Sequence, residues 1–173
     1  GIPNATPLVD GDLISVDIGL HFGGYYADHA FTVVVGSVDA KVKRLLDVTE
    51  QSLYDGISAA QAGERIGDIG HAIESAIRPH GFGIVRQYVG HGIGRALHER
   101  PSVPNYGKPN TGDLIKPGMC LAIEPMVTLG TWKTKTLHDL WTVVTSDGSL
   151  AAHFEHTIAI TPNGTEILTV LDG

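Results

Sequence analysis

Two aspartates interrupt an apolar hairpin near the start of the chain. Residues 13–36 read LISVDIGLHFGGYYADHAFTVVVG, two apolar runs joined by a Gly-Gly pair, with Asp17 in the first run and Asp28 in the second. Aspartate is depleted in strands because it prefers water and competes for backbone hydrogen bonds. Two carboxylates held close together on a buried sheet repel each other, so one keeps its proton or a cation lies between them. We take the cation as the hypothesis.

Strand alternation predicts what surrounds the two acids. Successive side chains of a strand point to opposite faces, so Asp17 shares its face with Ser15 and Gly19. On the return strand, Asp28 shares its face with Tyr26, Ala30 and Thr32. These neighbours are small or polar, which leaves room for a ligand to approach both carboxylates.

Two later acids and a histidine extend the pattern. Glu124 lies in CLAIEPMV and Glu155 in AHFEHTIAIT, both expected inside strands, and His91 lies in an expected loop between Gly90 and Gly92. Those glycines are expected to leave space around the imidazole and to allow unusual backbone angles. Four carboxylates and one neutral histidine suit a pair of divalent ions of the Mn, Fe, Co or Zn kind. Two such metal ions bound side by side are a known arrangement for catalysing hydrolysis.

The elements that hold these residues form an expected α+β fold. Helical periodicity predicts one helix over residues 37–62, capped by Ser37 or Asp39, and a second over 68–80. The three prolines of residues 95–111 predict irregular structure there. Besides the hairpin, strands are expected within 83–94 and at 119–127, 134–137, 140–145, 152–161 and 166–170. Two helices covering one side of a mostly antiparallel sheet give a single domain over residues 1–173.

Composition excludes several other classes of protein. The chain has 173 residues, a net charge of −7 and no cluster of Lys and Arg, which argues against nucleic-acid binding. A single cysteine, Cys120, rules out an internal disulfide and fits a reducing compartment. No apolar run is long enough to span a membrane and no signal peptide is evident, so a cytoplasmic location is expected.

Four sequence motifs resemble those of a known family. They are SVDIGL with GYYADHAFTVVVG, VGHGIGRALHERPSVPNYG, LIKPGMCLAIEPM, and LWTVVTSDGSLAAHFEHTIAIT. With the spacing of the four acids and the histidine, they resemble the type I methionine aminopeptidases, which have the pita-bread metallopeptidase fold. The resemblance extends from Gly1 to Val170. It implies a curved, mostly antiparallel sheet with helices on its outer face, and removal of the initiator methionine from nascent proteins.

The same resemblance implies a role for each site residue. Asp17 resembles a ligand of one metal, Asp28 and Glu155 resemble carboxylates that bridge two metals, and His91 and Glu124 resemble ligands of the other. Glu124 is also expected to carry protons between water and the leaving amine. The implied cofactors are two divalent ions (Co, Mn, Fe or Zn).

The resemblance also implies substrate contacts and partners. His98 resembles a histidine that hydrogen-bonds the substrate, and Trp141 resembles a wall of the methionine pocket. Leu97 stands where an aromatic pocket residue is common. The implied partners are nascent polypeptides that begin with Met, with association to the ribosome as a further expectation and no direct nucleic-acid contact.

One feature departs from the family. A further catalytic histidine usually precedes a Gly-Ile-Pro run, and here that run is residues 1–3. The sequence leaves open a shortened chain, a second chain that supplies the preceding segment, and a naturally short relative. In each case a lone chain is expected to expose apolar surface.

Rival interpretations use the same five ligands. One is a proline-directed relative such as prolidase or aminopeptidase P, against which IEPM and HERPSVPNYG argue. Another is a pita-bread binding module without catalysis, and a third is a fragment that binds metal without turnover. Other histidines have simpler interpretations: His29 and His156 are expected on the face opposite the neighbouring acids, and His153 in a surface or loop position.

Overall fold

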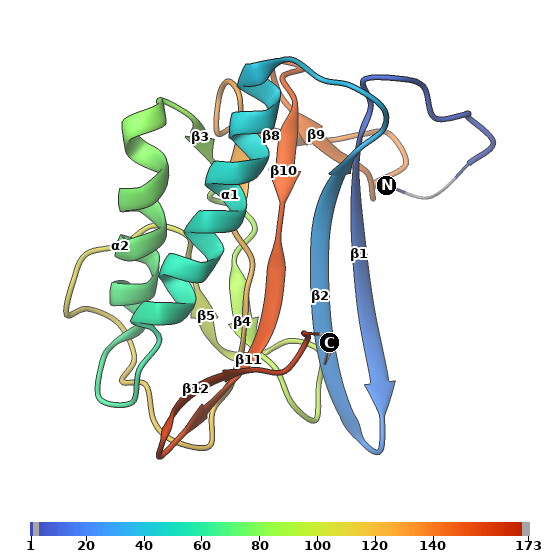
Figure 1. Cartoon of the computed structure of the whole chain (residues 1–173). Coiled ribbons are helices and arrows are strands. Elements are labelled where there is room, and N and C mark those ends of the chain that lie inside the picture. The colour runs from blue at the N-terminus through green and yellow to red at the C-terminus, as the bar shows by residue number, and fades with distance from the viewer. Residues whose placement is uncertain (2–3, 171–173) are drawn as a thin grey trace.

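The computed structural model describes residue 1 and residues 4–170, so most of the Gly-Ile-Pro run lies outside the described residues. In chain order the elements are β1 (Leu13–Phe22), β2 (Tyr25–Val34), α1 (Ala40–Ala59), α2 (Ile66–Ile77), the 3-10 helix η1 (Arg78–His80), β3 (Gly83–Ile84), β4 (Gly90–Gly92), β5 (Glu99–Val103), β6 (Cys120–Ile123), β7 (Met126–Thr128), β8 (Thr134–Thr136), β9 (Val143–Thr145), β10 (Ala151–His153), β11 (Glu155–Thr161) and β12 (Gly164–Ile167). The main sheet has the order β1-β2-β11-β6-β4-β5, with β12 beside β11, and β10-β7-β3 form a second sheet (Figure 1). All these pairings are antiparallel, so the expected α+β class is confirmed.

The aspartate hairpin forms as predicted. β1 and β2 pair from Leu13 opposite Val34 to Phe22 opposite Tyr25. The turn between them requires positive φ at two successive residues, and Gly23 and Gly24 adopt φ values of +59° and +84°. Such a two-glycine turn matches the twist of the flanking strands and fixes their register. The register in turn decides which face each aspartate occupies.

Both helices form, with ends that their capping groups set. α1 begins at Ala40 because the Asp39 carboxylate accepts the Val42 N–H at 2.8 Å. α2 begins two residues earlier than expected because Asp68 accepts the Arg65 N–H at 2.8 Å from inside the first turn. The predicted end at residue 80 corresponds to η1, which Gly81 terminates with φ +70°.

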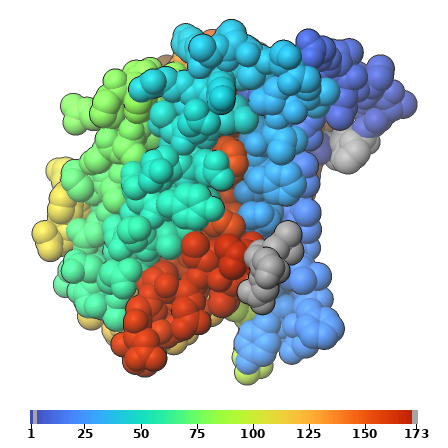
Figure 2. Space-filling view, in the orientation of Figure 1, coloured from blue at the N-terminus to red at the C-terminus, as the bar shows by residue number. Residues whose placement is uncertain are grey.

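The helices cover only part of the sheet. α1 packs on β10, β7, β11 and β6, and α2 packs on α1 and β5 (Figure 1). The hairpin lies beside the two helices, which do not cover it (Figure 2). Its apolar side chains Ile18, Leu20 and Phe22 are 53%, 59% and 82% exposed. The expectation of exposed apolar surface is therefore confirmed for the described residues.

Two predictions for residues 90–111 are wrong. His91 lies in a short strand, β4, and not in a loop, and the segment expected to be irregular contains β5. Pro101 is tolerated in β5 because that strand is the last of its sheet, where alternate N–H groups need no strand partner.

Two predicted long strands are each divided between sheets. Residues 119–127 form β6 and β7 with a break at Glu124-Pro125, and residues 152–161 form β10 and β11 with a break at Phe154. β6 and β11 belong to the main sheet, whereas β7 and β10 belong to the second sheet. Both acids therefore lie where the chain passes from one sheet to the other. Glu124 lies in the break between β6 and β7 and not in a strand as predicted, whereas Glu155 is the first residue of β11 and so lies at the end of a strand. β8, β9 and β12 overlap their predicted strands with shifted ends.

A glycine of α2 brings this helix against the loop that supports Glu124. A Cβ at Gly70 would lie 2.4 Å from the Tyr106 carbonyl oxygen and 2.6 Å from that of Pro104. Between these two residues, Asn105 donates from Nδ2 to the Glu124 carbonyl oxygen at 3.0 Å. The close approach of α2 therefore keeps the Asn105 amide in place.

Gly70→Ala is expected to destabilise the chain by about 1–3 kcal/mol, because the methyl group overpacks against fixed backbone. This outcome opposes helix propensity, which favours alanine over glycine by about 1 kcal/mol. Urea unfolding followed by circular dichroism measures the change. The matched control is Ser75→Ala on the exposed face of the same helix, for which no loss of stability is expected. Equal stability of Gly70→Ala and the unaltered chain would contradict the prediction.

None of the described helices has the length and apolar character needed to cross a membrane.

Candidate metal centre

Strand register places three of the acids on one face of the main sheet. Ala30 of β2 lies opposite Asp17 of β1 on one side and opposite Glu155 of β11 on the other. Directly opposed residues point to the same face, so Asp17 and Glu155 share the face of Ala30. Asp28 precedes Ala30 by two residues and points the same way. The spacing of the hairpin and its pairing with β11 thus gather these carboxylates.

The same face carries the histidine and the fourth acid. Ala122 of β6 lies opposite His91 of β4 and opposite Thr157 of β11. Thr157 is two residues beyond Glu155, so His91 shares the face of that acid. The Thr157 hydroxyl also accepts the Asp28 N–H and donates to the Asp28 carbonyl oxygen, both at 2.8 Å. Glu124 follows Ala122 by two residues, just past the end of β6.

The side chains converge closely at the centre of this face. Ligand atoms of Asp28, His91 and Glu155 all lie within 4.8 Å of one another. His91 Nε2 is 4.0 Å from Asp28 Oδ2 and 3.5 Å from Glu124 Oε1. Asp17 is exposed, and together with Glu124 it lines a hollow in the protein surface. Three predicted ligands thus form a tight group, and the other two lie beside it.

The electrostatics of the cluster are those of a site that needs positive charge. Burial, and after it the charges of Glu124, Asp28 and Asp17, raises the pKa of the Glu155 carboxyl to about 10. Burial and then the charge of Asp17 also raise the pKa of Asp28, against a lowering by His91. Without a cation, the chain meets this repulsion by keeping protons on carboxyl groups.

Two buried oxygen atoms of the cluster have no hydrogen-bond partner among the described residues. They are Asp28 Oδ1 and Glu155 Oε1. An unpartnered buried polar atom is costly, and coordination of a cation would remove that cost. Carboxylate oxygens with one imidazole nitrogen form a donor set that suits divalent ions such as Mn²⁺, Co²⁺ or Zn²⁺. The residues present therefore fit a divalent metal centre.

A backbone carbonyl fixes the orientation of the His91 ring, and the glycines on either side of His91 allow neighbouring strands to pack closely. His91 Nδ1 lies 2.9 Å from the Gly92 carbonyl oxygen, which leaves Nε2 facing the acids. A Cβ at Gly90 would lie 2.3 Å from the Ala122 carbonyl oxygen, and one at Gly92 would lie 2.2 Å from that of Arg100. The prediction of unusual backbone angles here is wrong, because no positive φ occurs at either glycine. The glycines let neighbouring strands approach β4.

A hollow of about 740 Å³ leads to the acids. His98 and Trp141 line it, and Trp141 is 68% exposed, so it is not a core residue. The His98 ring centroid lies 4.3 Å from that of His91. Leu97 lies against Gly19 and is not among the described residues that line the hollow. The remaining walls include Met126, Val143 and Ala152, which make part of the hollow apolar.

His153 is the site residue that the sequence analysis missed. It was expected in a surface or loop position, but it ends β10 and lines the hollow, with Nε2 3.7 Å from Glu124 Oε2. A signal for this position was present, because His153 precedes Glu155 by two residues in one predicted strand and so shares its face.

The opposite face carries a histidine pair, as strand alternation predicts. The rings of His29 and His156 stack at 4.8 Å between centroids, directly behind Asp28 and Glu155. His29 Nδ1 lies 2.6 Å from the Glu155 carbonyl oxygen, and Tyr54 of α1 lies against His156. Burial and then the charge of His29 lower the pKa of His156 to about 4.

This low pKa predicts a loss of stability in mild acid. The unfolded chain binds the His156 proton near pH 6.5, whereas the folded chain binds it only near pH 4. The stability is therefore present above pH 6.5 and falls by up to about 3 kcal/mol as the pH drops to 4. His156→Gln is expected to flatten this part of the curve, measured by urea unfolding at each pH. Substitution of the exposed His71 by Gln is the control, and parallel curves for all three chains would contradict the assignment.

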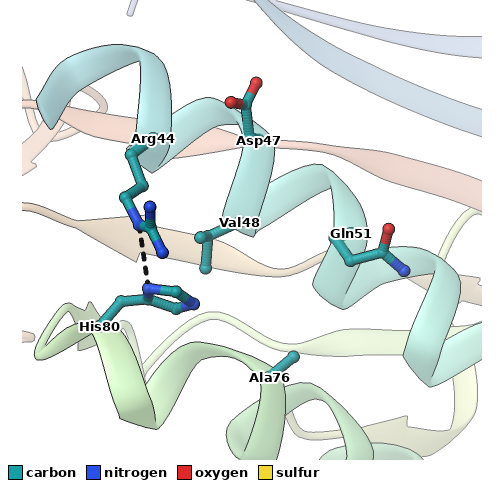
Figure 3. A pocket seen from close by; sticks show the side chains of 6 residues that line it. All are labelled: Arg44, Asp47, Val48, Gln51, Ala76 and His80. Carbon is teal, nitrogen blue, oxygen red and sulfur yellow. Dashed lines mark hydrogen bonds between the residues drawn. The ribbon is translucent and has the colours of Figure 1, made fainter. Parts of the chain in front are cut away.

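A smaller hollow of about 310 Å³ lies between α1 and the end of α2 (Figure 3). Arg44 donates from Nε to His80 Nδ1 at 3.2 Å across it, and Asp47 stands nearby. It shares no described lining residue with the larger hollow. Its mixed charges form no metal-binding group, since the group of Asp28, His91 and Glu155 is the only one among the described residues.

A buried carboxylate and histidine cluster on a curved antiparallel sheet defines a candidate metallohydrolase. Comparison with known proteins agrees with this class: the sequence model of metallopeptidase family M24 matches residues 1–162. Methionine aminopeptidase 1 from Bacillus subtilis is 55% identical over 169 residues, which cover 98% of this chain and 68% of that protein. The chain belongs to metallopeptidase family M24 and, within it, to the methionine aminopeptidases.

Solved structures agree with this assignment. The methionine aminopeptidase from Thermotoga maritima superposes with a TM-score of 0.92 at 50% identity, covering 94% of this chain and 65% of that chain. The prolidase from Pyrococcus furiosus has a TM-score of 0.79 at 24% identity, covering all of this chain and 45% of that chain, which shows the fold alone. The expected pita-bread fold is thus confirmed. This chain spans about two thirds of its methionine aminopeptidase relatives.

Proposed function

We propose that this chain removes the N-terminal methionine from polypeptides by metal-assisted hydrolysis. The observation that carries the proposal is the buried group of Asp28, His91 and Glu155, next to Glu124, which lines a hollow with partly apolar walls. We infer the substrate, a polypeptide with an N-terminal methionine, from the name of the Bacillus subtilis relative, methionine aminopeptidase 1. Because initiator methionine is removed from new polypeptides, we place the activity in the cytoplasm.

The residues that would hold two divalent ions are the five sequence-predicted ligands. Asp28 and Glu155 lie between the other ligands and are suited to bridge, Asp17 lies on one side, and His91 with Glu124 lies on the other. When bound, such ions polarise a scissile carbonyl and lower the pKa of water to near neutrality.

The remaining steps fall to side chains along the hollow. Glu124 is placed to take a proton from the attacking water and to pass it to the leaving amine. His98, which is exposed, lines the hollow and lies next to His91, is placed to donate a hydrogen bond to the substrate peptide. Met126 and Trp141 provide apolar surface for the side chain of the first residue. Binding energy from that side chain would hold the peptide bond at the acids.

A peptide panel with added metal tests this proposal. We expect the chain, supplied with Co²⁺ or Mn²⁺, to release methionine from Met-Ala-Ser and to leave Xaa-Pro peptides intact. Glu124→Gln is expected to abolish release, whereas Glu166→Gln, an exposed acid on β12, keeps it. Cleavage of Xaa-Pro peptides would favour the proline-directed alternative. Metal uptake without cleavage of either peptide would favour a metal-binding chain without turnover, and the absence of bound metal would favour a binding module.

A further inference from the structure

His153 presents an unpartnered buried nitrogen to a predicted metal ligand. Its Nε2 is buried and has no hydrogen-bond partner in the part of the chain that the structure describes, and it lies 3.7 Å from Glu124 Oε2. The side chains of His153 and Glu124 are 16% and 12% exposed. A buried polar atom without a partner is rare in folded proteins and calls for a physical explanation.

The backbone of His153 is fixed from two sides. The Thr32 hydroxyl accepts the His153 N–H and donates to the His153 carbonyl oxygen, both at 2.9 Å. On its other side His153 lies opposite Met126 in the pairing of β10 with β7. With the main chain held in this way, the imidazole needs only side-chain rotation to reach Glu124.

Glu124 is placed between two imidazole groups. His91 Nε2 lies 3.5 Å from its Oε1, and His153 Nε2 lies 3.7 Å from its Oε2. His153 is not part of the close ligand group formed by Asp28, His91 and Glu155 among the described residues. One oxygen of Glu124 thus faces that group, and the other faces His153.

We propose that His153 is a positioning residue for Glu124. Its imidazole donates from Nε2–H to Oε2, which leaves Oε1 directed at His91 and at the metal ion that the two residues would hold. Such partners of metal ligands fix the ligand orientation, and their loss typically weakens metal binding about 10–100-fold. The inference rests on the proposed metal function and adds to it a residue that controls one of the ligands.

Three variants of the whole chain test the role. His153→Leu cannot donate a hydrogen bond, His153→Gln can donate from its amide, and His71→Leu is a control on the exposed face of α2. Isothermal titration with Mn²⁺ is expected to show affinity for one ion lowered about 10–100-fold in the leucine variant. The glutamine and control variants are expected to bind as the unaltered chain does. If the leucine variant does not fold, His153→Asn, whose amide is too short to reach Oε2, replaces it.

Absorption spectra of Co²⁺-loaded chains separate positioning from ligation. We expect the same visible bands for the unaltered chain and His153→Gln, since the ligand set is unchanged. Altered bands in the glutamine variant would identify His153 as a direct ligand, and unaltered Mn²⁺ affinity in the non-donating variant would show that it plays no part. Either result overturns the proposal.

A measurement without metal distinguishes this inference from the proposed function. Long-range ¹H–¹⁵N spectra of the metal-free chain are expected to show the proton of His153 on Nε2, and a proton on Nδ1 alone would contradict the contact. If the unaltered chain binds no metal ion, the proposed function fails, whereas this spectrum still tests the hydrogen bond to Glu124.

Discussion

Adding Mn²⁺ or Co²⁺ to the metal-free chain at pH 7 is expected to raise its unfolding temperature by roughly 8–16 °C and to release protons. The stabilisation follows because the ions bind the folded chain, where Asp28, His91 and Glu155 converge, and not the unfolded one. Ligand at about 1,000 times its dissociation constant adds about 4 kcal/mol. In a domain of this size, each kcal/mol raises the unfolding temperature by about 2–4 °C.

Proton release follows from the raised pKa of Glu155, which is about 10. At pH 7 this carboxyl carries its proton in the metal-free chain, and it must lose that proton to act as a ligand. Titration calorimetry in buffers of different ionisation enthalpy is expected to give about one proton per chain. Mg²⁺, which prefers a hydrated octahedral shell, is the control ion, and stabilisation without proton release would contradict this explanation.

The faces of the hairpin could be predicted from the sequence because they depend on local rules. Alternation places Asp17 and Asp28 on one face and His29 on the other, and the Gly23-Gly24 turn fixes the register. The same reasoning predicted that His156 would lie behind Glu155, where it stacks on His29. These outcomes need no knowledge of the distant parts of the chain.

The site residues come together only because strands that are far apart in the sequence pair with one another. Glu155 reaches Asp28 only because β11 pairs with β2, and His91 joins them only through β6. Nothing local in the sequence specifies these pairings. The five ligands could be predicted from the sequence because the motifs around them resemble those of a known family. The local sequence around each ligand, taken alone, gave only a weak signal.

Errors in the sequence analysis occur where tertiary hydrogen bonds override local preference. The glycines around His91 predict a loop, but strands on both sides of β4 complete its hydrogen bonding. Pro125 and Phe154 interrupt runs that look like continuous strands, and the chain changes sheets at each. His153 is a different case, because alternation along the predicted strand over residues 152–161 already placed it on the face of Glu155.

The substitution Glu155→Gln is expected to make the metal-free chain more stable at pH 7 and to abolish its stabilisation by metal ions. In the metal-free chain the Glu155 pKa is raised from 4.5 to about 10. The stability that its protonated form contributes is fully present below pH 4.5 and is lost progressively as the pH rises towards 10. Glutamine has nearly the same shape and does not titrate. The metal-free variant should therefore match the unaltered chain near pH 4 and exceed it by about 3 kcal/mol at pH 7.

With metal present the order is expected to reverse. Glutamine offers no charged oxygen to a bridging position, so Mn²⁺ should no longer raise the unfolding temperature of this variant, while it still stabilises the unaltered chain. Glu166→Gln, an exposed acid on β12, is the matched control and should change neither measurement by more than about 0.5 kcal/mol. Urea unfolding at several pH values, with EDTA or with Mn²⁺, distinguishes the cases. A variant less stable than the unaltered chain in EDTA at pH 7 would show that burial of the acid does not oppose folding. In that event the cation would not be needed to offset repulsion among the acids, and the electrostatic basis of the metal centre would be wrong.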